Sequence, residues 1–269
     1  SEVSNEVQNI SDLKIPAVML FGIPSQKDEK GTSAFADDGI VQKAISEIKN
    51  NFGDKISIMA DVCLCQYTSS GHCGIINDKK IDNDLSIETL TKIAVSQAKA
   101  GVDVVSPSAM MDGQVSAIRK GLDDANFKDI IIMSHSAKHS SSFYSPFRDA
   151  AECAPQFGDR KTYQVPFTNP REAMREVEAD VEEGVDIVMI KPALSYLDLI
   201  AEAKKRFNIP VSAYSVSGEY AMVKAAANQG WIKEDQIINE ILSSIKRAGA
   251  DFIVTYFAKS GAKIISDNS

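Results

Sequence analysis

Three of the four cysteines of this chain lie within eleven residues, in the stretch DVCLCQYTSSGHC. They are Cys63, Cys65 and Cys73, and His72 stands beside the last of them. Thiolate ligands favour zinc, and three protein ligands leave one of its four coordination positions open. An open position is typical of a metal that handles substrate, whereas a structural zinc site is closed. The cluster therefore predicts a catalytic zinc site, with His72 as a possible fourth ligand and a structural site as the alternative.

Two lysines follow buried apolar runs and could act as nucleophiles. Lys191 ends the run at 187–190, where apolar neighbours would lower its pKa and free the amine to form a Schiff base with a carbonyl. Lys138 comes shortly after the preceding run at 130–133. If the two runs are neighbouring strands, both lysines project into one pocket, and two adjacent ammonium groups depress each other's pKa. The alternative for each lysine is a solvated position at the rim.

Further polar residues could complete such a pocket. Arg148 and Arg160 follow Lys138 and could bind a substrate carboxylate, although an Arg148–Asp149 surface ion pair is an alternative. Asp61 directly precedes the cysteine cluster and could bind a substrate amine or orient a ligand. Other residues at strand ends or in the same loop that could line the pocket are Ser108, Phe143, Tyr144, Phe147, Gln164, Ser217 and Tyr256.

The elements that must position these residues alternate regularly along the chain. Seven continuous apolar runs, at 17–21, 56–60, 102–105, 130–133, 187–190, 211–214 and 252–255, predict strands that are buried on both faces. Segments with helical spacing separate them, which favours a (β/α)₈ TIM barrel. A doubly wound sheet is disfavoured because no G-x-G-x-x-G motif follows the first strand. We predict a single catalytic domain over residues 1–269.

The strand count is seven and not eight, and a helix-like segment at 2–13 comes before the first strand. We therefore expect the first barrel strand to be missing from this chain. Two connections are long, at 61–86 and 134–170, and both leave the carboxyl ends of strands. Because long connections in compact domains are usually functional, and barrel active sites lie at this end, we expect both to form the active site.

Composition narrows the function classes. The chain has 269 residues, 44% hydrophobic and 25% charged, which is ordinary for a soluble globular protein. A net charge of −8 without a Lys/Arg block argues against nucleic acid as a partner. No apolar run approaches the ~20 residues that span a bilayer, and no signal-peptide pattern is present, so we expect no membrane partner and a cytoplasmic location. Clustered cysteines fit a reducing compartment. Cys153 stands apart and is predicted to be a small side chain that is buried or half-buried.

Several long stretches resemble one enzyme family. They are DVCLCQYTSSGHCG, SPSAMMDGQVSAIRKGLD, MSHSAKHSSSFYSPFRDAAECAPQFGDRKTYQ, DIVMIKPALSYLDLI and YSVSGEYAMVKAA. They are similar to porphobilinogen synthase, also called 5-aminolevulinate dehydratase, and the resemblance covers residues 18–256. It implies a TIM-barrel lyase that condenses two molecules of 5-aminolevulinate into porphobilinogen, the pyrrole precursor of tetrapyrroles such as haem.

The resemblance also implies a role for each matching residue. Lys191 matches the lysine that forms the Schiff base with the first substrate, and Lys138 matches the lysine that holds the second. Cys63, Cys65 and Cys73 match the ligands of the zinc-dependent branch, so His72 is expected to be a neighbour of the site and not a ligand. Residues that match the binding of the second substrate's carboxylate are Arg148, Arg160 and Gln164, those for the first substrate's carboxylate are Ser217 and Tyr256, and those near its amino group are Asp61 and Ser108. Glu176 aligns with an acidic residue that organises an allosteric magnesium, although a solvated helix glutamate is the alternative.

The chain departs from the family pattern at a few positions. His135 stands where a tyrosine is usual, His139 replaces an aromatic residue, Ala109 replaces an aspartate, and Cys153 stands where serine is common. The N-terminal arm that builds the family's homo-octamer is missing as well, which leaves the octamer open for this chain. Two other functions stay possible: a single-lysine Schiff-base aldolase, and a zinc-stabilised assembly protein without enzymatic activity.

Overall fold

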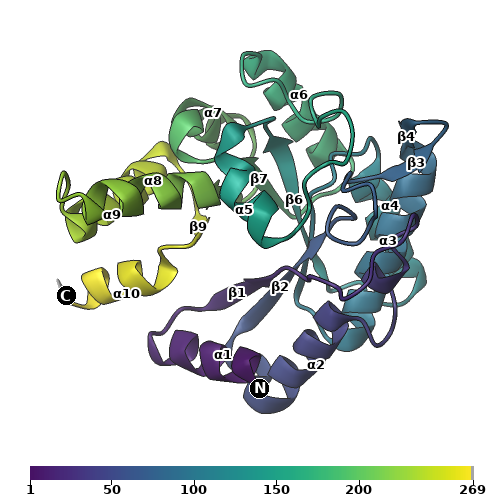
Figure 1. Ribbon diagram of the computed structural model, residues 1–269, viewed down its shortest axis with the longest axis horizontal. Helices are drawn as coiled ribbons and strands as arrows, with labels where there is room; N and C mark the ends of the chain where they lie inside the picture. Colours follow the sequence, from purple (N-terminus) through teal and green to yellow (C-terminus); the bar gives the residue numbers. More distant parts are fainter. Residues whose placement is uncertain (268–269) are drawn as a thin grey trace.

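One parallel sheet organises the computed structural model, which describes residues 1–267 of the chain. Its seven strands run in the order β1-β2-β5-β6-β7-β8-β9 and curve into a nearly closed barrel (Figure 1). The strands are β1 (Ala17–Leu20), β2 (Ser57–Val62), β5 (Val104–Pro107), β6 (Ile131–Lys138), β7 (Ile187–Lys191), β8 (Val211–Ser215) and β9 (Phe252–Thr255). All seven predicted strands are confirmed. Their uninterrupted apolar runs are typical of strands in a sheet that is covered on both faces.

Helices surround the outer face of the sheet (Figure 1). They are α1 (Glu2–Asp12), α2 (Ile40–Phe52), α3 (Asn83–Ala100), α4 (Gln114–Asp124), α6 (Pro170–Glu182), α7 (Leu197–Arg206), α8 (Ser217–Asn228), α9 (Glu234–Ala248) and α10 (Ala258–Asp267). Apolar faces of these helices point inward; α2, for example, buries Val41, Ile45 and Ile48. Gly101 ends α3 with a φ of 100°, the left-handed cap that turns the chain into β5. No helix within residues 1–267 is long and apolar enough to span a membrane.

The barrel is open between β1 and β9. These two strands are the edges of the sheet, and their residues are half-buried, whereas every residue of β5 and β8 is buried. A groove of about 1070 Å³ lies along β9, between the end of α1 and the helices α9 and α10. The strand count of seven is thus confirmed for the residues that the structure describes.

The two long connections are more ordered than expected. The first contains an antiparallel hairpin of β3 (Ile75–Asn77) and β4 (Lys80–Asp82). Its turn residues Asp78 and Lys79 both have positive φ, at 48° and 63°, which is typical of a two-residue hairpin turn. The turn was not predicted, because neither of its two residues is the glycine that is usual in such turns. The second connection begins later, because β6 continues to Lys138, and it contains a 3₁₀ turn (Ser142–Tyr144) and α5 (Ser145–Ala150).

Two apolar layers fix the barrel. The larger layer lies between the sheet and the helices, and a smaller one fills the barrel interior. Interior side chains include Met19, Met59, Val104, Met133 and Met189. They form an apolar floor, so that only the carboxyl ends of the strands are left to present polar groups at the barrel mouth.

Candidate active site

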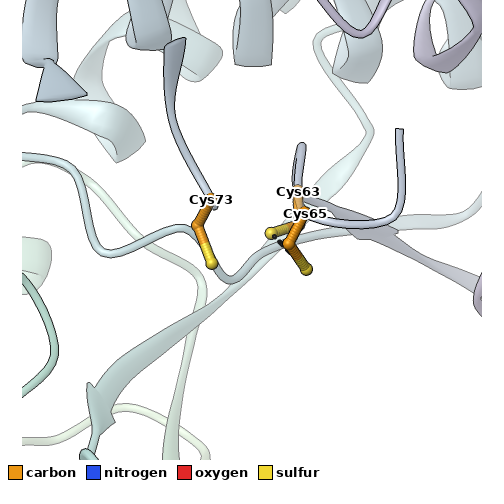
Figure 2. A group of neighbouring side chains, drawn as sticks. All are labelled: Cys63, Cys65 and Cys73. Atoms are coloured by element: carbon orange, nitrogen blue, oxygen red, sulfur yellow. Dashed lines mark hydrogen bonds between the residues drawn. The ribbon is translucent and has the colours of Figure 1, made fainter. Parts of the chain in front are cut away.

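Three thiols meet at the end of β2. The Sγ atoms of Cys63, Cys65 and Cys73 all lie within 4.8 Å of one another, and all three side chains are buried (Figure 2). The Cys63 and Cys65 sulfurs are 3.5 Å apart. Sulfurs that share one zinc ion at Zn–S distances of ~2.3 Å would lie ~3.8 Å apart. The donor set therefore fits a zinc ion with little rearrangement.

The thiols also influence each other's charge. The thiols of Cys63 and Cys65 hold the pKa of Cys73 well below its ordinary value, and the cations of Arg160 and Lys138 act in the same direction. The cluster thus favours one thiolate even among buried groups, and a thiolate is the form that binds a metal.

His72 lies beside the cluster but is held by other groups. Its Nδ1 is 3.1 Å from the Tyr163 hydroxyl and its Nε2 is 2.9 Å from the Phe157 carbonyl oxygen. Because both ring nitrogens have protein partners, His72 is not a fourth ligand in this arrangement.

The two lysines lie side by side. Strands β6 and β7 are neighbours, and their register pairs Lys138 with Lys191. Both side chains are buried, with 5% and 7% of their surface exposed. Lys191 Nζ lies 4.2 Å from the centre of the Tyr214 ring and 5.5 Å from that of Tyr144. Lys138 Nζ instead donates a hydrogen bond to the Ser108 carbonyl oxygen.

The pKa values of the two lysines shift in opposite directions. Burial lowers the pKa of Lys191 to about 7, and the charge of Lys138 adds to this effect. Burial acts on Lys138 too, but the three cysteines and Asp61 outweigh it and raise the pKa of Lys138 above its ordinary value. The prediction that the lysines depress each other's pKa is correct for Lys191 and wrong for Lys138, because the anionic groups gather on one side only.

Asp61 and Ser108 lie together beside the lysines, as predicted. Asp61 Oδ1 accepts a hydrogen bond of 2.6 Å from the Ser108 hydroxyl, and Oδ2 accepts one of 3.2 Å from Gln66 Nε2. Burial raises the pKa of Asp61 in spite of the nearby lysines.

The residues predicted to bind a carboxylate have free polar atoms. Within residues 1–267, the Nε atoms of Arg148 and Arg160 and both amide atoms of Gln164 are buried without a hydrogen-bond partner. Leaving such a group unpaired costs about 1–3 kcal/mol, so these atoms point to a polar ligand. Arg148 lies over the Tyr144 ring at 5.8 Å, and Arg160 Nη2 donates to the Gly71 carbonyl oxygen at 2.9 Å. Arg160 lines the cavity of the lysines, whereas Gln164 lines a neighbouring one.

Ser217 and Tyr256 complete the opposite wall. The Ser217 hydroxyl accepts a hydrogen bond from the Phe147 N–H at 3.1 Å and lies 3.3 Å from the Phe143 carbonyl oxygen. It therefore ties α8 to the loop that follows β6. Tyr256 is 45% exposed, and its ring centre lies 6.3 Å from that of Tyr214.

Glu176 lies away from the lysines, on α6. It lines the same cavity of about 800 Å³ as Gln164, together with Asp112, Glu172 and residues of the β3–β4 hairpin. Burial and then the charge of Asp112 raise its pKa. The structure does not bring Glu176 to the lysine site, so its suggested role concerns a separate site.

The two unusual histidines differ in their surroundings. His135 is buried inside the barrel, and neither of its ring nitrogens has a hydrogen-bond partner among residues 1–267. Burial, followed by the charge of Lys191, lowers its pKa, so its ring is neutral. His139 stacks on Tyr196 with ring centres 3.9 Å apart, and its Nδ1 lies 3.2 Å from the Lys191 carbonyl oxygen. Neither histidine belongs to the thiol cluster.

Sequence reasoning missed Tyr214, whose ring lies beneath Lys191. Side chains alternate between the two faces of a strand, and on β8 this alternation turns Tyr214 toward the barrel interior. The sequence could have indicated this position, but an aromatic residue in an apolar strand is usually an ordinary core residue. The cavity at the lysines has a volume of only about 20 Å³, room for a single water molecule, and Tyr144 and Phe147 line it from the loop after β6. A substrate needs more room than this arrangement leaves, and Tyr144 and Phe147 are among the side chains that limit it.

Comparison with known proteins points to one family. The family model described as delta-aminolevulinic acid dehydratase matches residues 1–264. The curated delta-aminolevulinic acid dehydratase of Bacillus subtilis is 55% identical over 265 residues, which cover 98% of this chain and 82% of the relative. That of Archaeoglobus fulgidus is 54% identical over 261 residues, covering 97% and 80%.

A solved structure agrees with these sequences. The Toxoplasma gondii delta-aminolevulinic acid dehydratase (porphobilinogen synthase), in complex with its reaction product porphobilinogen, superposes with a TM-score of 0.97 at 44% identity. The match covers 100% of this chain and 77% of that chain. A 2,3-dimethylmalate lyase, at 14% identity and a TM-score of 0.51 over 99% of this chain and 76% of that one, shares the fold alone.

Proposed function

The chain belongs to the delta-aminolevulinic acid dehydratase family, and we propose that Lys191 and Lys138 carry out its chemistry beside a zinc ion held by Cys63, Cys65 and Cys73. The activity that family membership assigns is the condensation of two molecules of 5-aminolevulinate into porphobilinogen with loss of water. This is a lyase reaction of porphyrin and haem biosynthesis, on a TIM-barrel fold. The observation that carries the assignment of the residues is the pairing of two buried lysines on neighbouring strands.

Lys191 is the better nucleophile of the two. With a pKa of about 7, a large fraction of its amine is neutral near pH 7, whereas an ordinary lysine is almost fully protonated. The neutral amine attacks the ketone carbon of the first substrate, and loss of one water gives the imine. Asp61 and Ser108 lie close enough to receive the amino group of that substrate. Ser217 and Tyr256, at the opposite wall, bind its carboxylate in this proposal.

Lys138 stands in an anionic environment and holds the second substrate. Its ammonium must lose a proton before it can form an imine, so neighbouring negative charge has to be compensated first. A zinc ion held by the three cysteines would supply that compensation and a Lewis acid for the substrate amine. The unpaired nitrogens of Arg148 and Arg160 are suited to the second substrate's carboxylate. Holding both substrates covalently makes the condensation intramolecular, which is worth up to ~7–11 kcal/mol.

Four further predictions accompany this function. We expect residues 1–269 to act as one catalytic domain, the protein to be cytoplasmic and to form a homo-octamer, and Glu176 to help hold an allosteric magnesium. The acidic neighbours of Glu176 support the last of these, since carboxylates are preferred ligands of magnesium.

Borohydride trapping tests the proposal. Borohydride reduces an imine to a stable amine, so peptide mass spectrometry after reaction with 5-aminolevulinate should find adducts on Lys191 and Lys138. Lys204, which is 42% exposed in its side chain, is the internal control and should remain unmodified. An adduct on one lysine only, formed with an aldol substrate, would favour an aldolase. No adduct on zinc-loaded protein would contradict the catalytic role of both lysines.

A further inference from the structure

The fourth cysteine lies beside the thiol cluster although it is distant in sequence. Cys153 is fully buried, in the turn that follows α5. It is close enough to Cys65 for the two thiols to shift each other's pKa: Cys153 raises the pKa of Cys65, and Cys65 lowers that of Cys153. Cys153 is not one of the three sulfurs that lie within 4.8 Å of one another. It is thus a fourth sulfur at the edge of the cluster, reached through Cys65.

Contacts between two loops hold Cys153 in this place. The Arg160 guanidinium donates to the Cys153 carbonyl oxygen and to that of Gly71, which joins the two loops. The Gln156 N–H donates to the Ser70 carbonyl oxygen at 2.9 Å. A Cβ atom at Gly71 would lie 2.3 Å from the Ala154 carbonyl oxygen, so only glycine allows the loops to approach so closely. The position of Cys153 is therefore built into the fold.

A buried thiol beside a three-thiol metal site has an obvious chemical use. Zinc in proteins takes four ligands, and thiolate sulfur is among those that it prefers. We propose that Cys153 supplies the fourth thiolate to the metal when no substrate is bound and leaves it when the substrate's amine binds. This inference rests on the proposed function, because it requires that Cys63, Cys65 and Cys73 hold the metal.

The exchange is balanced in atoms and charge. When Cys153 binds, its S–H bond breaks, the proton goes to solvent, and one water molecule leaves the fourth position. When the substrate binds, its ammonium gives up one proton so that the amine can take the fourth position, and the leaving sulfur takes up one proton. Cys153 follows the same loop that carries Tyr144 and Phe147 over the lysines.

Cobalt substitution tests the inference directly. Co²⁺ replaces zinc in thiolate sites, and its near-ultraviolet charge-transfer absorbance grows with the number of bound thiolates. For substrate-free protein we expect the absorbance per cobalt to fall by about a quarter in Cys153→Ser, from four thiolates to three. Addition of 5-aminolevulinate should bring the wild-type spectrum to that of the variant. Gln156→Ala is the matched control, since its exposed side chain can be removed while its N–H still binds Ser70, and its spectrum should not change.

X-ray absorption of the zinc-loaded wild type gives a second measurement that needs no variant and so does not depend on whether Cys153→Ser folds. Four sulfurs around zinc without substrate, and three with it, are expected. Three sulfurs in both states, or identical cobalt spectra for wild type and Cys153→Ser, would overturn the inference and leave the proposed function intact. Absence of any thiolate–metal band would instead contradict the metal site of the proposed function.

Discussion

The two walls of the active site surround equally buried lysines with opposite chemistry. Lys138 faces the end of β2, where three thiols and Asp61 form what we call the anionic wall, and its pKa is raised. Lys191 faces the ring of Tyr214 on β8, which we call the aromatic wall, and burial lowers its pKa to about 7. Because the two residues are paired in register, strand position alone does not explain the difference. Burial acts on both lysines, and the charged groups beside each one decide whether its pKa is finally raised or lowered.

The largest effect is expected from removing the nucleophile of the aromatic wall. Lys191→Met should lower porphobilinogen formation by at least about 10³-fold, because no other neutral amine stands at this position. Lys138→Met should also stop product formation but leave the imine at Lys191 trappable by borohydride. Lys204→Met, at the surface, is the control and should be as active as the wild type. If Lys138→Met abolished the adduct at Lys191, the two walls would not act separately.

Removing the metal should affect only the anionic wall. A zinc chelator is expected to lower product formation by ~10²-fold or more, and added zinc should restore it. The borohydride adduct at Lys191 should persist in the chelated protein, since that lysine faces Tyr214 and not the thiols. Product formation and the Lys191 adduct are measured on the same chelated sample. An equal loss of product and adduct would show that the metal supports Lys191 as well.

The rate at which the first imine forms at Lys191 should depend on pH in a way that reports the pKa of this lysine. Because only the neutral amine attacks, the trapping rate at Lys191 should fall about tenfold per pH unit below pH 7 and level off above it. The same shift affects stability. Lys191 has a lowered pKa in the folded state, so the unfolded chain binds more protons between pH 7 and the ordinary lysine pKa, and stability should rise with pH in that window. A rate that keeps rising to pH 10 would contradict the lowered pKa.

The smallest effect is expected where the aromatic wall meets the loop. Ser217→Ala removes the hydroxyl that accepts from the Phe147 N–H, a bond worth about 1 kcal/mol. The loop should then open more easily while binding of the first carboxylate weakens, so KM should rise about two- to fivefold. Ser145→Ala, which removes an exposed hydroxyl of the same loop, is the control. Steady-state kinetics at saturating zinc distinguishes the two variants.

The sequence alone determined a good deal of this protein. Uninterrupted apolar runs predicted all seven strands, because a strand that is buried on both faces has apolar residues at every position. The spacing of Cys63, Cys65 and Cys73 placed three soft ligands on one loop, and Lys138 and Lys191 stood at strand ends in the sequence itself. Local patterns of this kind are readable because they depend on residues close together in the chain.

Tertiary structure decided the rest. The opposite pKa shifts of the lysines, the ring of Tyr214 beneath Lys191, and the approach of Cys153 to Cys65 all join residues far apart in sequence. The β3–β4 hairpin was not predicted because its turn residues, Asp78 and Lys79, adopt positive φ although neither is a glycine. Charge and desolvation act through space, so a sequence can supply the ionisable groups, but only the fold determines which of them become neighbours.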